Sequence, residues 1–184
     1  MGIQEVLVIG AGTMGNGIAH VFAQTGFDVV LFDSFPAAAQ KGLATIEKNL
    51  DRQLKKGKIT EEDVKQTLGH IKIANDISEG KNADLAVEAI IENKTIKLEL
   101  FRLLDSTCKP EAILASNTST ISITEIAAST KRADKVIGMH FMNPVPMMKL
   151  VEIIRGLATS DETYEVINIS ADFSEAGICD GLQN

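Results

Sequence analysis

The sequence predicts a Rossmann-like α/β fold, a doubly wound and mainly parallel sheet with helices on both faces. Three observations predict it. Short apolar runs alternate with helix-like stretches, a glycine-rich turn follows the first run, and an acidic residue ends the second. Runs that are apolar throughout are typical of strands buried on both faces. The 184 residues, 45% of them hydrophobic, suffice for one domain with a packed core.

The alternation defines the elements in order. Strands are expected at Glu5–Ile9, Asp28–Phe32, Ile71–Ala74, Leu85–Glu88, Ile113–Ala115, Val136–Met139 and Lys149–Ile154. Helices are expected at Met14–Gln24, Pro36–Lys56, Glu61–Leu68, Lys94–Ser106, Ile123–Ala128 and Asp161–Ser170. Pro36 stands where a first-turn proline is favoured. Thr60 precedes three acidic residues, which is typical of a helix N-cap.

The segment after the second strand is longer than one crossover helix needs. It has room for two helices joined by the turn KKGKIT. We therefore expect a helical hairpin over about residues 36–69, standing off the sheet. The last residues, DFSEAGICDGLQN, have no strong apolar period. We expect no element there, and interpret them as a frayed end or as a point where the chain was cut short.

Composition argues against several classes of function. The net charge of −7 and the aromatic content of 4% argue against nucleic-acid binding. Cys108 and Cys179 are far apart and fit no metal-site spacing, so we predict reduced thiols and no metal. No signal peptide and no apolar run of membrane-spanning length are seen. We expect a cytoplasmic protein with no membrane partner.

A dinucleotide site is predicted at the first turn. The stretch VLVIGAGTMGNGIAH places Gly10, Gly12 and Gly15 between a strand and a helix. The three glycines allow a tight turn, close approach to a pyrophosphate, and close packing of the helix on the strand. Thr13 and Met14 begin the helix, whose unpaired N–H groups attract phosphate. The alternative is a glycine-rich turn that binds nothing.

Asp33 supports the dinucleotide interpretation. It ends the second strand, DVVLF, about 20 residues after the glycines. An acidic residue there accepts hydrogen bonds from the adenosine ribose and repels a 2′-phosphate. The predicted cofactor is therefore NAD rather than NADP.

Polar residues after the fifth expected strand suggest where the chemistry occurs. Asn117 and Ser119 belong to ASNTS, which follows Ile113–Ala115. The carboxyl end of such a strand faces the ligand crevice. Small hydroxyl and amide groups there can hold a nicotinamide ribose and a substrate oxygen. The alternative is a turn cluster, which Ser, Asn and Thr often form.

A histidine and a glutamate are the candidate proton-transfer pair. His140 ends the strand GMH, and imidazole exchanges protons near neutral pH. Glu152 lies in an otherwise apolar strand, where a lone buried charge is costly. A hydrogen bond between them would satisfy the carboxylate and fix the imidazole tautomer. The alternatives are a core histidine and a glutamate on the exposed face of an edge strand.

For two pairs of charged residues, spacing alone does not indicate a binding site. Glu92 and Lys97 flank the start of a helix, and a solvated helix face is the favoured interpretation. Arg52 and Lys56 are one turn apart on the hairpin and share a face. Two cations there suit a diphosphate, although a solvated face is again the commoner outcome.

Four segments together resemble the 3-hydroxyacyl-CoA dehydrogenase family, and most of all its short bacterial 3-hydroxybutyryl-CoA members. They are IGAGTMGNGIAHVFAQTG, VEAIIENKTIKLELF, ASNTSTISITEIA and GMHFMNPVPMMKLVEII. The resemblance covers about Gln4 to Ser170. It implies a Rossmann-like domain with a helical hairpin insert, followed by a helical domain that forms the family's dimer.

The resemblance also implies residue roles. His140 would be the catalytic base, Glu152 its partner, and Ser119 a hydrogen-bond donor to the substrate oxygen. The positions that it places around NAD are Asp33, Glu92, Lys97, Ser119 and Asn143. The positions that it places at the coenzyme A moiety are Asn49, Arg52 and Lys56. The implied substrate is thus an acyl-CoA.

The departure from the family pattern lies at the end of the chain. The family continues with a strand, a Pro-Gly-Phe turn and the helical domain, and nothing after Ser170 matches. The predicted function is reversible, NAD-dependent oxidation of a short (S)-3-hydroxyacyl-CoA. A second hypothesis is a truncated NAD- and CoA-binding fragment with little catalysis. A third, another Rossmann dehydrogenase of hydroxy acids, would commonly use a lysine base, and the pair of His140 and Glu152 argues against it.

Overall fold

The computed structural model describes residues 2–170 and 178–182, and it confirms the predicted α/β fold. One sheet has the strand order β3-β2-β1-β4-β5-β6-β7-β8. The strands are β1 (Glu5–Ile9), β2 (Asp28–Phe32), β3 (Ile71–Ala74), β4 (Leu85–Glu88), β5 (Ile113–Ser116), β6 (Val136–Phe141), β7 (Val151–Arg155) and β8 (Ile178–Leu182). The helices are α1 (Thr13–Gln24), α2 (Pro36–Lys55), α3 (Glu61–Gly69), α4 (Lys94–Thr107), α5 (Ile123–Ala127) and α6 (Asp161–Ser170), with short 3-10 turns at Ile77–Gly80 and Ala133–Lys135.

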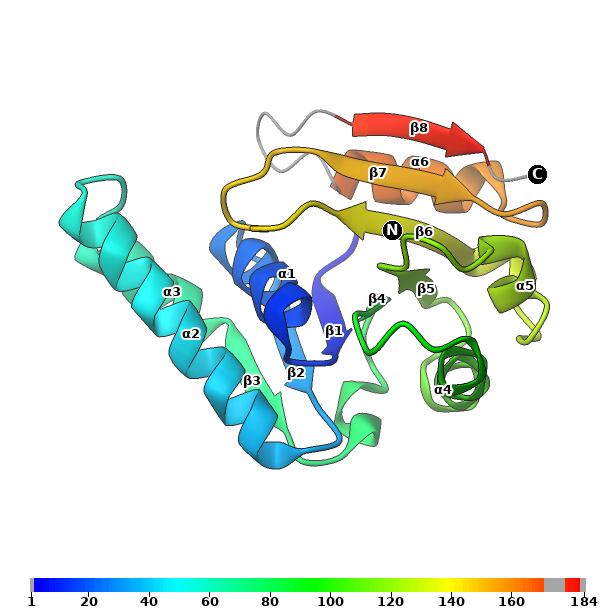
Figure 1. Cartoon of the computed structure of the whole chain (residues 1–184), viewed down its shortest axis with the longest axis horizontal. Helices are drawn as coiled ribbons and strands as arrows, with labels where there is room; N and C mark the ends of the chain where they lie inside the picture. Colours follow the sequence, from blue (N-terminus) through cyan, green and yellow to red (C-terminus); the bar gives the residue numbers. More distant parts are fainter. Residues whose placement is uncertain (1, 171–177, 183–184) are drawn as a thin grey trace.

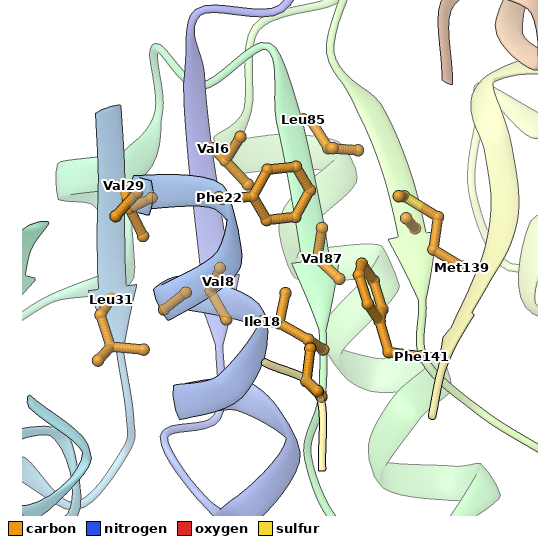
Figure 2. Close-up of a cluster of buried hydrophobic side chains, with 14 of the residues drawn as sticks. Val6, Val8, Ile18, Phe22, Val29, Leu31, Leu85, Val87, Met139 and Phe141 are labelled. Carbon is orange, nitrogen blue, oxygen red and sulfur yellow. The ribbon is translucent and has the colours of Figure 1, made fainter. Parts of the chain in front are cut away.

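Helices cover both faces of the sheet and create two apolar cores (Figure 1). Successive residues of β1 point alternately into them, so that Val6 and Val8 face α1 while Leu7 faces α4 and α5. This is why the strand is apolar throughout. Figure 2 shows Ile18 and Phe22 of α1 over the first core.

The hairpin of α2 and α3 leans on α1 and projects from the body of the molecule (Figure 1). Ile46 and Leu50 are its buried contacts along α2. The N-cap Thr60 accepts a hydrogen bond from the backbone N–H of Asp63 in a capping box. A Cβ on Gly42 would lie 3.0 Å from the Ala11 carbonyl oxygen, so this glycine lets α2 approach the glycine-rich turn.

The structure departs from the predicted elements at the carboxyl end. β6 is longer than predicted and runs to Phe141, whereas β7 begins later, at Val151. β7 is antiparallel to β6, and the other pairings in the sheet are parallel.

The strand β8 was not predicted. Its sequence, ICDGL, has a glycine and no apolar run, and it forms a strand by pairing with β7. The rest of the tail, residues 171–177 and 183–184, lies outside the described residues. Of the helices in the described ranges, none combines the length and the apolar character that crossing a bilayer requires.

Candidate active site

The glycine-rich turn joins β1 to α1. Two of its three glycines have no room for a side chain, whereas the third has. Gly10 has φ +96°, and a Cβ there would lie 2.6 Å from the Ala89 carbonyl oxygen. A Cβ on Gly15 would lie 1.6 Å from the Gly10 carbonyl oxygen. Around Gly12, in contrast, no atom lies within 4 Å of such a Cβ. Gly10 and Gly15 are therefore required by the fold, whereas Gly12 keeps an open approach to the N-terminus of α1.

Asp33 connects this turn to the end of β2. Its two carboxylate oxygens accept hydrogen bonds from the backbone N–H of Ala11 at 2.8 Å and of Phe35 at 2.9 Å. A carboxylate has about four acceptor sites. Two sites therefore remain for hydroxyl groups, as the sequence prediction for the ribose requires.

His140 and Glu152 face each other across β6 and β7. They are paired in the register of the two strands, and His140 Nδ1 lies 2.7 Å from Glu152 Oε2. Because a carboxylate only accepts, Nδ1 of the neutral imidazole carries the proton and Nε2 is the acceptor. The imidazole is 24% exposed and β7 lies between β6 and β8, so neither a sealed core histidine nor an edge strand describes this pair.

A buried ion pair joins β4 to α4 at the site. Glu88 ends β4, and its side chain is 0% exposed; Lys97 on the first turns of α4 is 1% exposed. Their charged atoms are 2.5 Å apart. Glu88 also accepts hydrogen bonds from Ser116 Oγ at 2.6 Å and from the Ile90 backbone at 2.7 Å. The expectation of a solvated helix face was wrong for Lys97, because the chain after β4 folds α4 onto the sheet and carries the lysine inside.

Glu92 joins the same group from the loop before α4. It lies 3.1 Å from Lys97 and accepts hydrogen bonds from Thr118 and, at 2.9 Å, from Thr120. Partial burial alone would raise the pKa of Glu92, but hydrogen bonds from Thr118, Thr120 and Lys97 and the charge of Lys97 lower it to about 2. Glu92 is therefore a carboxylate at neutral pH.

These groups surround a cleft of about 310 Å³ at the carboxyl ends of β4, β5 and β6, which we call the histidine cleft. Its lining consists of Met14, Ala89, Ile90, Glu92, Lys97, Asn117, Ser119, His140, Phe141, Met142 and Asn143. Asn117 Oδ1 accepts a hydrogen bond from the Phe141 backbone at 2.8 Å, which leaves the amide nitrogen to donate to a ligand. Ser119 is exposed on the cleft wall.

A second depression of about 440 Å³, the hairpin groove, lies between the glycine-rich turn, α2 and the turn after β6. Asn143 lines both spaces, so the groove and the histidine cleft are neighbours. Of the predicted coenzyme A contacts, only Asn49 lines the groove. Arg52 is exposed with its guanidinium 3.4 Å from Asn49 Oδ1, and Lys56 is exposed at the end of α2.

Sequence reasoning missed three residues that build the histidine cleft and two that line the groove. They are Glu88, Ser116 and Thr118, and Lys41 and Thr45. A usable signal existed for Glu88, because a charged residue at the carboxyl end of a buried strand is the same pattern that identified Asp33. Lys41 and Thr45 precede Asn49 by eight and four residues, a spacing that places all three on one helix face.

Comparison with known proteins places this geometry in a family. The family model described as 3-hydroxyacyl-CoA dehydrogenase, NAD binding domain, matches residues 5–175. The chain belongs to this family. The family's description confirms NAD as the predicted cofactor.

Relatives agree in sequence and in structure. The probable 3-hydroxybutyryl-CoA dehydrogenase of Bacillus subtilis is 54% identical over 163 residues, which are 89% of this chain and 57% of that protein. The 3-hydroxybutyryl-CoA dehydrogenase of Bradyrhizobium diazoefficiens is 51% identical over 163 residues, 89% of this chain and 56% of that protein. The crystal structure of (S)-3-hydroxybutyryl-CoA dehydrogenase from Ralstonia eutropha superposes with a TM-score of 0.96 at 44% identity, covering 99% of this chain and 64% of that one. The chain thus spans little more than half the length of the curated relatives it matches.

Proposed function

We propose that this chain catalyses reversible, NAD-dependent oxidation of a short-chain (S)-3-hydroxyacyl-CoA to the 3-ketoacyl-CoA. The observation that carries the proposal is the hydrogen-bonded pair of His140 and Glu152 at a cleft shared with Lys97 and Ser119. The three relatives named above as 3-hydroxybutyryl-CoA dehydrogenases support the choice of substrate class. NAD⁺ and the hydroxy substrate give NADH, the keto product and one proton.

The cofactor, when bound, supplies the acceptor for the hydride that leaves the substrate's C3. His140 Nε2 takes the proton from the hydroxyl group on the same carbon, and the C3–O bond becomes a carbonyl. Glu152 keeps the imidazole in the required tautomer and stabilises the imidazolium that forms. In the reverse direction, the imidazolium returns its proton to the oxygen. Ser119 and the Asn117 amide, which line the same cleft, would stabilise charge on that oxygen.

Other residues would bind the two ends of the cofactor and the coenzyme A moiety. The open side of Gly12, with Thr13 and Met14 at the start of α1, is suited to the cofactor's diphosphate. Asp33 would bind the adenosine ribose, while Glu92, Lys97 and Asn143 would hold the nicotinamide end. The face of α2 that bears Asn49, Arg52 and Lys56 would meet coenzyme A.

One further function is favoured by a specific observation. Because the chain spans only about half of its curated relatives, it would be a cofactor-binding fragment if turnover needs the rest. Dimer formation through the family's helical domain and a cytoplasmic location stay predictions.

The deciding experiment follows NADH consumption by absorbance with acetoacetyl-CoA as substrate. Turnover in the wild type that falls by about 100-fold or more in His140→Ala would support the dehydrogenase and its base. His70→Ala is the matched control, because His70 also pairs with a carboxylate, Asp28, at 2.8 Å, but is the C-cap of α3, just before β3. NADH binding without turnover in any variant would support the fragment instead.

A further inference from the structure

Glu88, Glu92 and Lys97, which we call the carboxylate–lysine cluster, contain unequal numbers of opposite charges. Both carboxylates share the one ammonium group of Lys97, at 2.5 Å and 3.1 Å. Within residues 2–170, no second cation is found in an ion pair with either carboxylate. The cluster therefore keeps one uncompensated negative charge beside the histidine cleft.

Both acids act as hydrogen-bond acceptors in these contacts. Glu88 receives hydrogen bonds from three donors, the Lys97 ammonium, the Ser116 hydroxyl and the Ile90 backbone, and it donates none in this arrangement. Glu92 has a pKa lowered to about 2. Because Glu88 and Lys97 are buried, water screens this charge less than it screens a surface charge.

The proposed reaction brings the nicotinamide ring close to the cluster. Hydride and proton leave adjacent atoms of the substrate, so the ring and the His140 imidazole must both contact the same carbinol group. A cleft of about 310 Å³ holds His140, Glu92 and Lys97 in one lining. This step depends on the proposed function.

We propose that Glu88 is a positioning residue that fixes Lys97 and, through the cluster's net negative charge, favours binding of the oxidised over the reduced nicotinamide. The oxidised ring carries a positive charge, whereas the reduced ring is neutral, so the attraction acts on one form only. Glu88 needs no contact with the cofactor for this effect. The charges of His140 and Glu152 also act on the ring, but they are the same in every variant below.

The test measures dissociation constants of this 184-residue chain for NADH, by fluorescence, and for NAD⁺, by competition. Glu88→Gln keeps the shape and removes the charge. We expect the ratio of the NAD⁺ constant to the NADH constant to rise by about threefold or more. Glu111→Gln is the matched control, because Glu111 is an exposed acid beside the amino end of β5, away from the cleft. Its ratio should match the wild type.

Two more variants keep the test decisive. Ser116→Ala removes a hydrogen bond to Glu88 without changing charge, and its ratio should stay at the wild-type value. Glu92→Gln neutralises the cluster at a partly exposed residue and should raise the ratio even if Glu88→Gln does not fold. An unchanged ratio in the folded Gln variants, or an equal rise in Ser116→Ala, would overturn the proposal.

Failure of the inference can be told apart from failure of the proposed function. A wild-type chain that binds neither cofactor form would overturn both. A chain that binds both forms, with a ratio that the charge of the cluster does not change, would overturn the inference alone.

Discussion

Lys97 lies on α4 and Lys56 is the C-cap of α2. Spacing along the chain favours a solvated position for both, yet their surroundings differ completely. Lys97 is 1% exposed and held between two carboxylates, with its amine 2.5 Å from Glu88. Lys56 is exposed at the end of α2, on the hairpin face with Asn49 and Arg52. Arg52 there makes a long 3.4 Å contact to Asn49.

Side chains in the buried cluster hold their geometry before a ligand binds, whereas those on the hairpin face do not. In the carboxylate–lysine cluster, short hydrogen bonds from β4, β5 and α4 fix each charge. On the hairpin face, solvent competes for every charge, and exposed ion pairs contribute little. The cluster should therefore affect folding and cofactor chemistry together, whereas the hairpin face should matter only when a ligand binds.

The largest difference between the two sites is expected when each lysine is removed. Lys97→Met should cost about 3–5 kcal/mol of unfolding free energy, because two carboxylates would lose their only cation. Lys56→Met, the control on α2, should change it by no more than about 0.5 kcal/mol. Urea unfolding followed by circular dichroism measures both. Equal effects would show that burial does not distinguish the two sites.

The second prediction concerns His20, where α1 meets the hairpin. His20 is 0% exposed, and its Nε2 lies 3.4 Å from Gln53 of α2. Burial lowers the pKa of His20 to about 4, whereas the unfolded chain keeps an ordinary value of about 6.5. Between these values the unfolded state binds more protons, so stability should decrease as the pH falls from about 6.5 to about 4.

The loss assigned to His20 should approach about 3 kcal/mol. Unfolding curves of the wild type and His20→Gln across this pH range isolate it, since the other titrating groups are common to both. Parallel pH profiles would contradict the assignment.

A third, smaller change in stability is expected where the hairpin packs against the glycine-rich turn. Gly42→Ala should destabilise the fold by about 1 kcal/mol, because its Cβ would lie 3.0 Å from the Ala11 carbonyl oxygen and this crowding exceeds the gain in helix propensity. Gly69 is the last residue of α3, and no atom lies within 4 Å of a Cβ added there. Gly69→Ala should therefore be neutral or stabilising. Thermal unfolding of the two variants should therefore show opposite or clearly separated shifts.

The smallest effect is expected on the hairpin face itself. Arg52→Ala should leave stability within about 0.5 kcal/mol of the wild type but weaken coenzyme A binding by about threefold to tenfold. Lys65→Ala removes an exposed cation from α3 and should do neither. Isothermal titration with free coenzyme A, at low and at high salt, makes the comparison. Equal losses in both variants would assign the effect to overall charge.

The order and type of nearly every helix and strand were predictable from the sequence. The patterns that predicted them are local, because each involves residues close together in the chain. They are the apolar runs of strands buried on both faces, the glycine-rich turn and Asp33. They sufficed to predict the doubly wound sheet, the hairpin and the dinucleotide end of the site. The strand β8 was not predictable in this way, because its five residues, ICDGL, form a strand only against β7.

Which charged residues are buried depends on how distant segments pack, and this was not predictable from the sequence. Lys97 and Arg52 look alike along the chain, since each lies on a helix with other polar residues. Lys97 became buried because α4 folds back beside Glu88 and Ser116, which come from two different strands. The pairing of His140 with Glu152 likewise required the antiparallel register of β6 and β7. Burial and register depend on contacts between distant segments, and spacing in one segment does not contain them.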